Sequence, residues 1–170
     1  MGNMKPKLLL LGHARHGKDT VAEILRDDYK FKLEPSSMAI SEYIRKNFLQ
    51  SQNYSTNLEC YEDRVNHRPA WFDAIAHYNK DDPCAWAKYI LSMGDIYCGM
   101  RRLEEFDECI TQKLFDYVIW VDALERHPPE PVSSFTIPQH RADLVIDNNG
   151  TLDQLYENID SCMKEINVYK

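Results

Sequence analysis

Apolar and polar residues form blocks along the chain that predict short buried strands separated by helices. The first block, KLLLL at residues 7–11, contains an unbroken apolar run from Leu8 to Leu11 that ends at Gly12, as in a strand covered on both faces. Apolar residues then recur at helical spacing from Lys18 to about Asp28. The same reasoning predicts three later strands: residues 95–98, 116–122 and 142–147. Strands alternating with helices favour an α/β fold with a parallel sheet.

The segments between these strands have weaker patterns. Residues 31–33 are a candidate additional strand, and Ser36 with Ser37 can cap a helix that runs toward Phe48. Polar residues 50–59 predict a loop. Residues 60–91 predict mostly helices, with breaks at Pro69 and at residues 82–83.

The second half of the chain has clearer helical signals. Apolar residues form one stripe of a helix after residue 102: Leu103, Phe106, Ile110 and Leu114. Residues 125–139 contain four prolines and predict a loop. Thr151 and Gln154 fit a capping box for a terminal helix, whose apolar positions are Leu152, Leu155, Ile159 and Met163. We expect one domain over residues 1–170, with a five-stranded parallel sheet, helices on both faces and ligands at the carboxyl ends of the strands.

Composition narrows the functional class. The chain has a net charge of -7, which disfavours a stable nucleic-acid partner held by general electrostatics. Its longest apolar run is too short to cross a membrane, so we expect no membrane partner. Five scattered cysteines without CxxC spacing predict reduced thiols and a cytoplasmic location.

The loop after the first strand carries the strongest chemical signal. Residues 12–18, Gly12-His13-Ala14-Arg15-His16-Gly17-Lys18, have the spacing G-x-x-x-x-G-K of a phosphate-binding P-loop. Glycines let the backbone turn its N–H groups inward, the next helix presents its positive end, and the lysine adds a full charge. A strand before the loop and a helix after it support the prediction that it binds a polyphosphate.

The motif departs from the usual pattern at one position. Asp19 stands where a Ser or Thr hydroxyl usually meets Mg²⁺, and Thr20 follows it. A carboxylate can serve a hard cation directly or through water. The alternative is that Asp19 only stabilises the start of the helix.

Arginines are placed where a second phosphate would be held. The chain has only nine, and besides Arg15 five stand in segments expected to border the carboxyl edge of the sheet or a lid. These are Arg64, Arg68, Arg101, Arg102 and Arg126. Forked guanidinium groups suit a reaction that brings two polyanions together.

With these motifs the chain resembles the P-loop nucleoside monophosphate kinases, most closely the deoxynucleoside monophosphate kinases of tailed bacteriophages. The resemblance rests on GHARHGKDT, YEDRVNHRPAWFDAIAHYN, GMRRLEEF, VIWVDALERHPPEP and ADLVIDNNGTLDQL, in that order. It implies a P-loop NTPase fold with a helical acceptor-binding insertion at about residues 34–92 and a short lid at about residues 125–140.

The resemblance also implies roles for individual residues. Gly12 to Thr20 would hold the phosphates of ATP and Mg²⁺, with Arg126, Asn149 and Gly150 near the donor nucleotide. Arg101 would clamp the acceptor phosphate; the alternative is an ion pair with Glu104 or Glu105 on its own helix. The candidate acceptor site comprises Asp63, Arg64, Arg68, Trp71, Arg101 and Glu105, and Asp122 is a second candidate magnesium ligand. Arg141 is a weaker lid candidate, and most aromatic residues, including Trp86 and Trp120, are expected in the core.

We therefore expect a magnesium-dependent enzyme, in the host cytoplasm if it is phage-encoded, that transfers the γ-phosphate of ATP to a (deoxy)nucleoside 5'-monophosphate. Two alternatives stay open. One is a kinase for another acceptor, such as dephospho-coenzyme A, phosphomevalonate or a modified pyrimidine in phage DNA. The other is a nucleotide-binding regulator without catalysis. The sequence does not decide the nucleobase, the sugar or whether the chain forms a homodimer.

Overall fold

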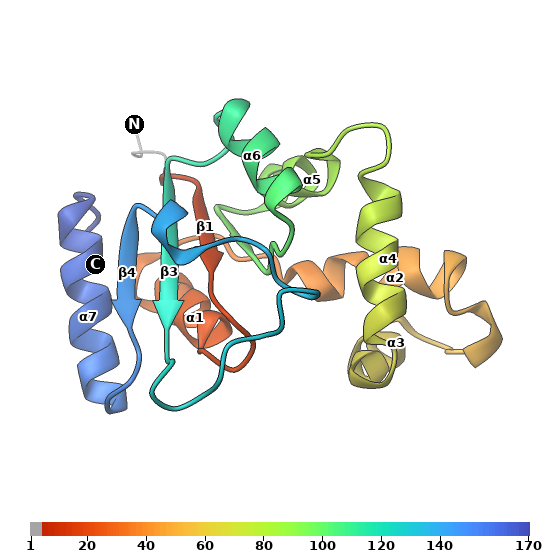
Figure 1. The fold of residues 1–170 in the computed structure, drawn as a ribbon, viewed down its shortest axis with the longest axis horizontal. Helices are drawn as coiled ribbons and strands as arrows, with labels where there is room; N and C mark the ends of the chain where they lie inside the picture. The colour runs from red at the N-terminus through yellow and green to blue at the C-terminus, as the bar shows by residue number, and fades with distance from the viewer. Residues whose placement is uncertain (1–4) are drawn as a thin grey trace.

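The fold is an α/β arrangement around a four-stranded parallel sheet, seen in a computed structural model that describes residues 5–170 (Figure 1). The strands are β1 (Leu8–Leu11), β2 (Ile96–Cys98), β3 (Tyr117–Asp122) and β4 (Leu144–Asp147). Their order in the sheet is β2-β1-β3-β4, and every pairing is parallel. The connection that leaves β1 leads to β2 on one side of the sheet, and the connection that leaves the neighbouring β3 leads to β4 on the other. In open α/β sheets, ligands bind at such a point, outside the carboxyl ends of the strands.

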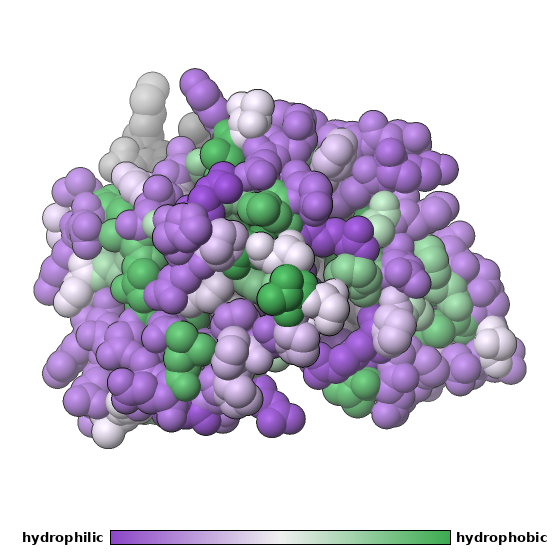
Figure 2. All heavy atoms as spheres, in the orientation of Figure 1, coloured by the Kyte–Doolittle hydropathy of each residue, from purple (hydrophilic) through white to green (hydrophobic). Residues whose placement is uncertain are grey.

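Residues 5–170 form seven α-helices. They are α1 (Lys18–Tyr29), α2 (Ser36–Asn47), α3 (Asn57–Glu62), α4 (Arg68–Tyr78), α5 (Ala85–Met93), α6 (Leu103–Thr111) and α7 (Leu152–Glu165). Figure 1 shows α7 beside β4, while α2, α3 and α4 form a helical region that projects on the opposite side of the molecule. The space-filling view is indented at its lower edge between this region and the sheet, and its apolar residues are scattered among hydrophilic ones (Figure 2).

Alternate residues of each strand enter two separate cores. Leu9 and Leu11 pack with Val118 and Trp120 on the face covered by α2, α5 and α6. Leu8 and Leu10 lie on the other face, which α1 and α7 cover. Since both faces are buried, an unbroken apolar run such as LLLL is what β1 requires. Trp86 and Trp120 are buried, which confirms the prediction that they belong to the core, and Trp71, predicted at the acceptor site, is buried as well.

The prediction of five strands is wrong. The candidate strand at residues 31–33 is reduced to one bridge, between Leu33 and Ile96. Asp95 takes the place of further pairing: its backbone N–H donates to Lys32 O at 2.7 Å, and its carboxylate accepts from Lys32 N at 2.8 Å. Two residues after Leu33, Pro35 is already the N-cap of α2, so the segment ends before a strand can extend.

Several local predictions also need correction. Ser36 does not cap α2; its hydroxyl donates instead to Cys98 O at 2.8 Å. The polar segment 50–59 includes a short 3-10 helix, Gln50–Gln52, and the start of α3, which Thr56 caps through a capping box with Glu59. Leu152 is 58% exposed because it is the first residue of α7 and lies outside the buried stripe of that helix.

Among residues 5–170, no helix combines the length and apolar character needed to span a membrane.

Candidate functional site

The loop between β1 and α1 has the backbone geometry that its two glycines permit. Gly12 has φ +141° and Gly17 has φ +93°, both in the region that favours glycine. A Cβ at Gly12 would lie 2.5 Å from the carbonyl oxygen of Val121, and one at Gly17 would lie 2.4 Å from Nδ2 of Asn148. Both glycines are therefore needed for the loop to pack against the carboxyl ends of β3 and β4.

Backbone donors gather where the loop enters α1. The N–H groups of Gly17, Lys18, Asp19 and Thr20 precede the first helical hydrogen bond, which Val21 donates to Gly17 O at 3.0 Å. Within residues 5–170 these four donors have no acceptor, and no side chain caps the helix. The Lys18 ammonium folds back onto His13 O at 2.9 Å, and burial lowers the pKa of Lys18. The loop thus presents unpaired donors and a partly desolvated cation to whatever anion enters.

The side chain of His16 connects the loop to the segment that follows β3 through two hydrogen bonds. Its side chain is fully buried, and its Nδ1 accepts from Ala123 N at 3.1 Å. The other ring nitrogen, Nε2, then carries the proton and donates to His127 O at 3.2 Å. Asn148 completes the frame by donating from Nδ2 to His16 O at 2.9 Å. His16 is therefore a structural part of the loop, with its polar atoms directed away from the loop's open side.

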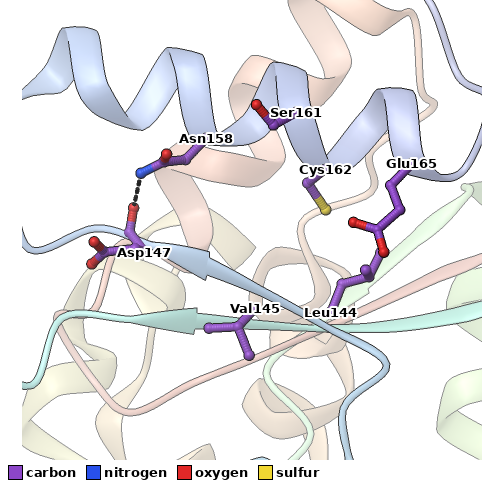
Figure 3. A pocket seen from close by; sticks show the side chains of 7 residues that line it. All are labelled: Leu144, Val145, Asp147, Asn158, Ser161, Cys162 and Glu165. Carbon is purple, nitrogen blue, oxygen red and sulfur yellow. Dashed lines mark hydrogen bonds between the residues drawn. The ribbon is translucent and has the colours of Figure 1, made fainter.

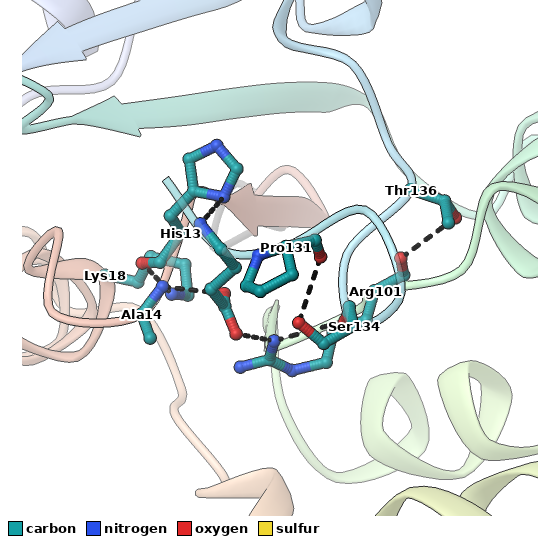
Figure 4. Close-up of polar contacts among 8 residues, drawn as sticks. His13, Ala14, Lys18, Arg101, Pro131, Ser134 and Thr136 are labelled. Carbon is teal, nitrogen blue, oxygen red and sulfur yellow. Dashed lines mark hydrogen bonds and ion pairs between the residues drawn. The ribbon is translucent and has the colours of Figure 1, made fainter. Parts of the chain in front are cut away.

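A carboxylate from a distant segment of the chain contacts the loop. Glu130, from the proline-rich segment after β3, accepts a hydrogen bond from Ala14 N at 2.7 Å through Oε2. Its other oxygen, Oε1, forms an ion pair with Arg101. Its backbone N–H donates to Nδ1 of His13 at 3.1 Å. Figure 4 shows these contacts bringing the loop, Arg101 and the proline-rich segment to one place.

Neighbouring charges and hydrogen bonds stabilise the ionised carboxylate of Glu130 in this position. Burial alone would raise the pKa of Glu130, but the hydrogen bond and charge of Arg101, the amide of Ala14 and the charge of Lys18 together hold it below its usual value. Burial and the nearby His16 lower the pKa of His13, which keeps its Nδ1 available as an acceptor. The ion pair of Arg101 with Glu104 or Glu105, which was the alternative to a phosphate clamp, is not formed within residues 5–170; Arg101 pairs with Glu130.

Asp122, at the end of β3, has an unpaired oxygen. Its Oδ1 is buried and has no hydrogen-bond partner in the described part of the chain, while Oδ2 accepts from Asn149 Nδ2 at 3.3 Å. Arg126 donates from Nη1 to Gly150 O at 3.3 Å, so the predicted donor-side residues Arg126, Asn149 and Gly150 lie together beyond the ends of β3 and β4. A buried carboxylate oxygen without a partner is a place for a cation or its bound water.

Asp19 and Thr20 are exposed at the start of α1. Asp19 Oδ1 accepts a weak hydrogen bond from Cys98 Sγ at 3.5 Å, and burial, with the adjacent Asp19 charge, raises the pKa of Cys98 to about 12. Residues 5–170 contain no cluster of three or more His, Cys, Asp or Glu side chains that could hold a metal ion. Mg²⁺ commonly binds through one or two carboxylates together with substrate phosphates, and Asp19 and Asp122 are the carboxylates that the sequence predicts for that role.

The predicted acceptor residues are not all brought to the loop. Asp63 accepts from Tyr54 at 2.5 Å and from His67 at 3.1 Å, and Arg64 lies over the ring of Tyr61. These contacts stay inside the helical region α2–α4. Within residues 5–170, no hydrogen bond or ion pair joins Asp63 or Arg64 to the loop or to Arg101.

Arg68 begins α4 and is exposed, whereas Trp71 is buried with an unpaired Nε1. Glu105 is 6% exposed and accepts from the Tyr97 hydroxyl at 3.3 Å, inside the core rather than at an open surface. Burial raises its pKa to about 7. Arg141 pairs with Asp107 at 2.6 Å on α6, which leaves it outside the loop as well.

A cavity between β4 and α7 lies apart from this loop (Figure 3). It measures about 190 Å³ and is lined by Leu144, Val145, Asp147, Asn158, Ser161, Cys162 and Glu165. Its charged lining residues, Asp147 and Glu165, are both acidic. It is therefore unsuited to phosphate, and the loop after β1 is the stronger candidate site.

No protein-family model and no curated protein matches the chain. The functional interpretation consequently depends on the residues and on the geometry of this site.

Sequence reasoning missed two parts of the site. Glu130 was not predicted to reach the loop, because its contacts with Ala14 and His13 span more than a hundred residues. Its position between prolines in PPEP, within the predicted lid, is the one local signal. The structural role of His16 was missed as well, because its partners, Ala123 and His127, are more than a hundred residues away and no local pattern indicates them.

Proposed function

We propose that this chain is a magnesium-dependent kinase of the P-loop NTPase fold that transfers the γ-phosphate of ATP to a (deoxy)nucleoside 5'-monophosphate. The observation that carries the proposal is the carboxylate of Glu130. One of its oxygens is held by a loop amide and the other by Arg101. A single anion therefore touches both the loop expected to hold the donor and the arginine expected to hold the acceptor.

The sheet supports this proposal. The bridge at Leu33 continues the order as Leu33-β2-β1-β3-β4, and the loop lies at the carboxyl end of the central strand β1. Four N–H donors without an acceptor among residues 5–170 lie at the start of α1, next to Lys18, whose ammonium donates to His13 O in the same loop. Such amides and the helix dipole stabilise phosphate without any rearrangement during the reaction.

The proposed reaction is a direct transfer. An oxygen of the acceptor phosphate forms a bond to the γ-phosphorus while the bond from that phosphorus to the bridging oxygen of ADP breaks. Lys18 and the loop amides stabilise the charge on the migrating group, and Arg101 holds the acceptor phosphate in line. Arg126, beside Gly150, contacts the donor nucleotide. Bound Mg²⁺, held through Asp19 and Asp122, would neutralise phosphate charge. Because the acceptor is already anionic, positioning supplies most of the rate enhancement.

An assay of ADP release with ATP, Mg²⁺ and each of the eight common nucleoside monophosphates tests the proposal. We expect turnover with at least one acceptor, and its loss in Lys18→Ala with an unchanged circular dichroism spectrum. Lys164→Ala, on the exposed side of α7, is the matched control and should keep full activity. Wild-type activity in Lys18→Ala would refute the role of the loop.

The same assay separates the alternatives. Turnover only with dephospho-coenzyme A, phosphomevalonate or a modified pyrimidine in DNA would support a kinase but would show that its acceptor is not a nucleoside monophosphate. Tight ATP binding without transfer to any acceptor would replace the enzyme by a nucleotide-binding regulator.

A further inference from the structure

Glu130 contacts two groups to which the proposed function assigns phosphates, the amide of Ala14 in the loop and the guanidinium of Arg101. Its carboxylate has the charge and the pair of acceptor oxygens of a phosphate edge, and it uses donors from both sides of the site. The backbone of Glu130 also contacts the loop, because its N–H donates to His13. A charged carboxylate and a triphosphate cannot share these donors.

The segment that carries Glu130 is held in position on both sides. Before it, His127 O accepts from the buried His16. After it, Thr136 N donates to Arg101 O at 2.9 Å, and Phe135 packs its ring against His13 at a centroid distance of 5.0 Å. These contacts before and after Glu130 hold its segment against the loop.

We propose that Glu130 is an internal anion that fills the phosphate site of the free protein and is displaced by the donor triphosphate. This inference rests on the proposed function and adds a regulation of the same site. While Glu130 is in place, Arg101 is engaged and the amide of Ala14 is occupied. Displacement frees Arg101, so donor binding prepares the site for the acceptor phosphate, and the donor binds first.

Calorimetric titration of the full chain with sodium tripolyphosphate and with ATP and Mg²⁺ tests the competition. Glu130→Gln keeps the size of the side chain and removes its charge. We expect it to bind both ligands about tenfold more tightly, because the competing conformer of the free protein is weakened. Glu104→Gln removes the same charge from an exposed residue close to Arg101 in sequence, and its affinity should change less than twofold.

Thermal unfolding distinguishes an internal anion from a merely structural contact. The ligand-free Glu130→Gln protein should unfold at a lower temperature than the wild type and gain more from saturating ATP. A structural contact would instead lower both the stability and the affinity. That second result overturns the proposal.

The order of binding has its own readout. With the nucleoside monophosphate that turns over fastest, a non-hydrolysable ATP analogue should tighten acceptor binding about tenfold in the wild type and have almost no effect in Glu130→Gln. Equal coupling in both proteins overturns the proposed order.

The proposal and the proposed function fail in different ways. A wild type that binds ATP, with a Glu130→Gln variant that binds it no more tightly, overturns the internal anion and leaves the kinase intact. Absence of ATP and tripolyphosphate binding in all three proteins overturns both.

Discussion

Glu105 is a buried carboxyl group whose ionisation should lower the stability of the fold. It is 6% exposed, and hydrogen bonds from Tyr97, at 3.3 Å, and from the side chain of Asn79 only partly offset the cost of burying its charge. Burial raises its pKa from 4.5 to about 7. The folded protein therefore holds the proton of Glu105 more tightly than the unfolded chain does. The contribution of Glu105 to stability is therefore fully present below pH 4.5 and is lost as the pH rises through its folded-state pKa of about 7.

The rise in pKa sets the size of the effect. Each pKa unit corresponds to about 1.4 kcal/mol, so full ionisation of Glu105 costs about 3 kcal/mol of unfolding free energy. Glu105→Gln keeps an acceptor for Tyr97 and cannot ionise. We expect the variant to match the wild type near pH 4.5 and to exceed its stability by about 3 kcal/mol near pH 8.

Urea unfolding at a series of pH values from 4.5 to 8 measures this difference. Glu104→Gln, at the exposed neighbouring position, should show no pH-dependent change relative to the wild type. A stability difference for Glu105→Gln that stays constant over the whole range would refute the assignment of a neutral, buried carboxyl. Because Glu105 lies in the core, the variant should also keep its affinity for the acceptor, in contrast to the role that its sequence position suggested.

Three further predictions concern the loop, the metal and a helix end. Gly17→Ala should lose about 1–2 kcal/mol of stability in urea unfolding, because its left-handed φ is strained for alanine; its Cβ would also meet Asn148, and ATP binding measured by calorimetry should be lost. Asp122→Asn should raise several-fold the Mg²⁺ concentration for half-maximal activity, and an unchanged requirement would remove Asp122 from the magnesium site. Thr151→Ala should lower the unfolding free energy by about 1 kcal/mol in thermal denaturation, since the capping box with Gln154 is broken.

The parts of the fold that sequence predicted correctly are those set by neighbouring residues. An unbroken run at Leu8–Leu11, a glycine and then helical spacing define β1, the loop and α1, because burial on both sheet faces and the glycine turn leave few alternatives. Arg126 and Asn149 lie together as expected, since both follow strands that end at the same edge.

The incorrect predictions concern residues whose structure depends on contacts with residues far away in the sequence. At residues 31–33 a strand was expected, but Asp95 supplies the polar partners of Lys32 and leaves only the bridge at Leu33. The spacing of Arg101 and Glu105 suggested a helical pair, yet Glu105 is buried and Arg101 turns to Glu130, which lies 29 residues away. No local pattern contains either contact.

The attachment of the proline-rich segment limits how it can move. His127 is tied to His16 on one side, and Phe135 and Thr136 are fixed to His13 and Arg101 on the other. Rotation is therefore restricted to residues 128–134, where Pro128, Pro129 and Pro131 each hold φ nearly constant. With both ends held and three fixed φ angles between them, the stretch has few conformations to choose from. If the proposed displacement of Glu130 occurs, this stiffness would bring its carboxylate back to the same position when the ligand leaves.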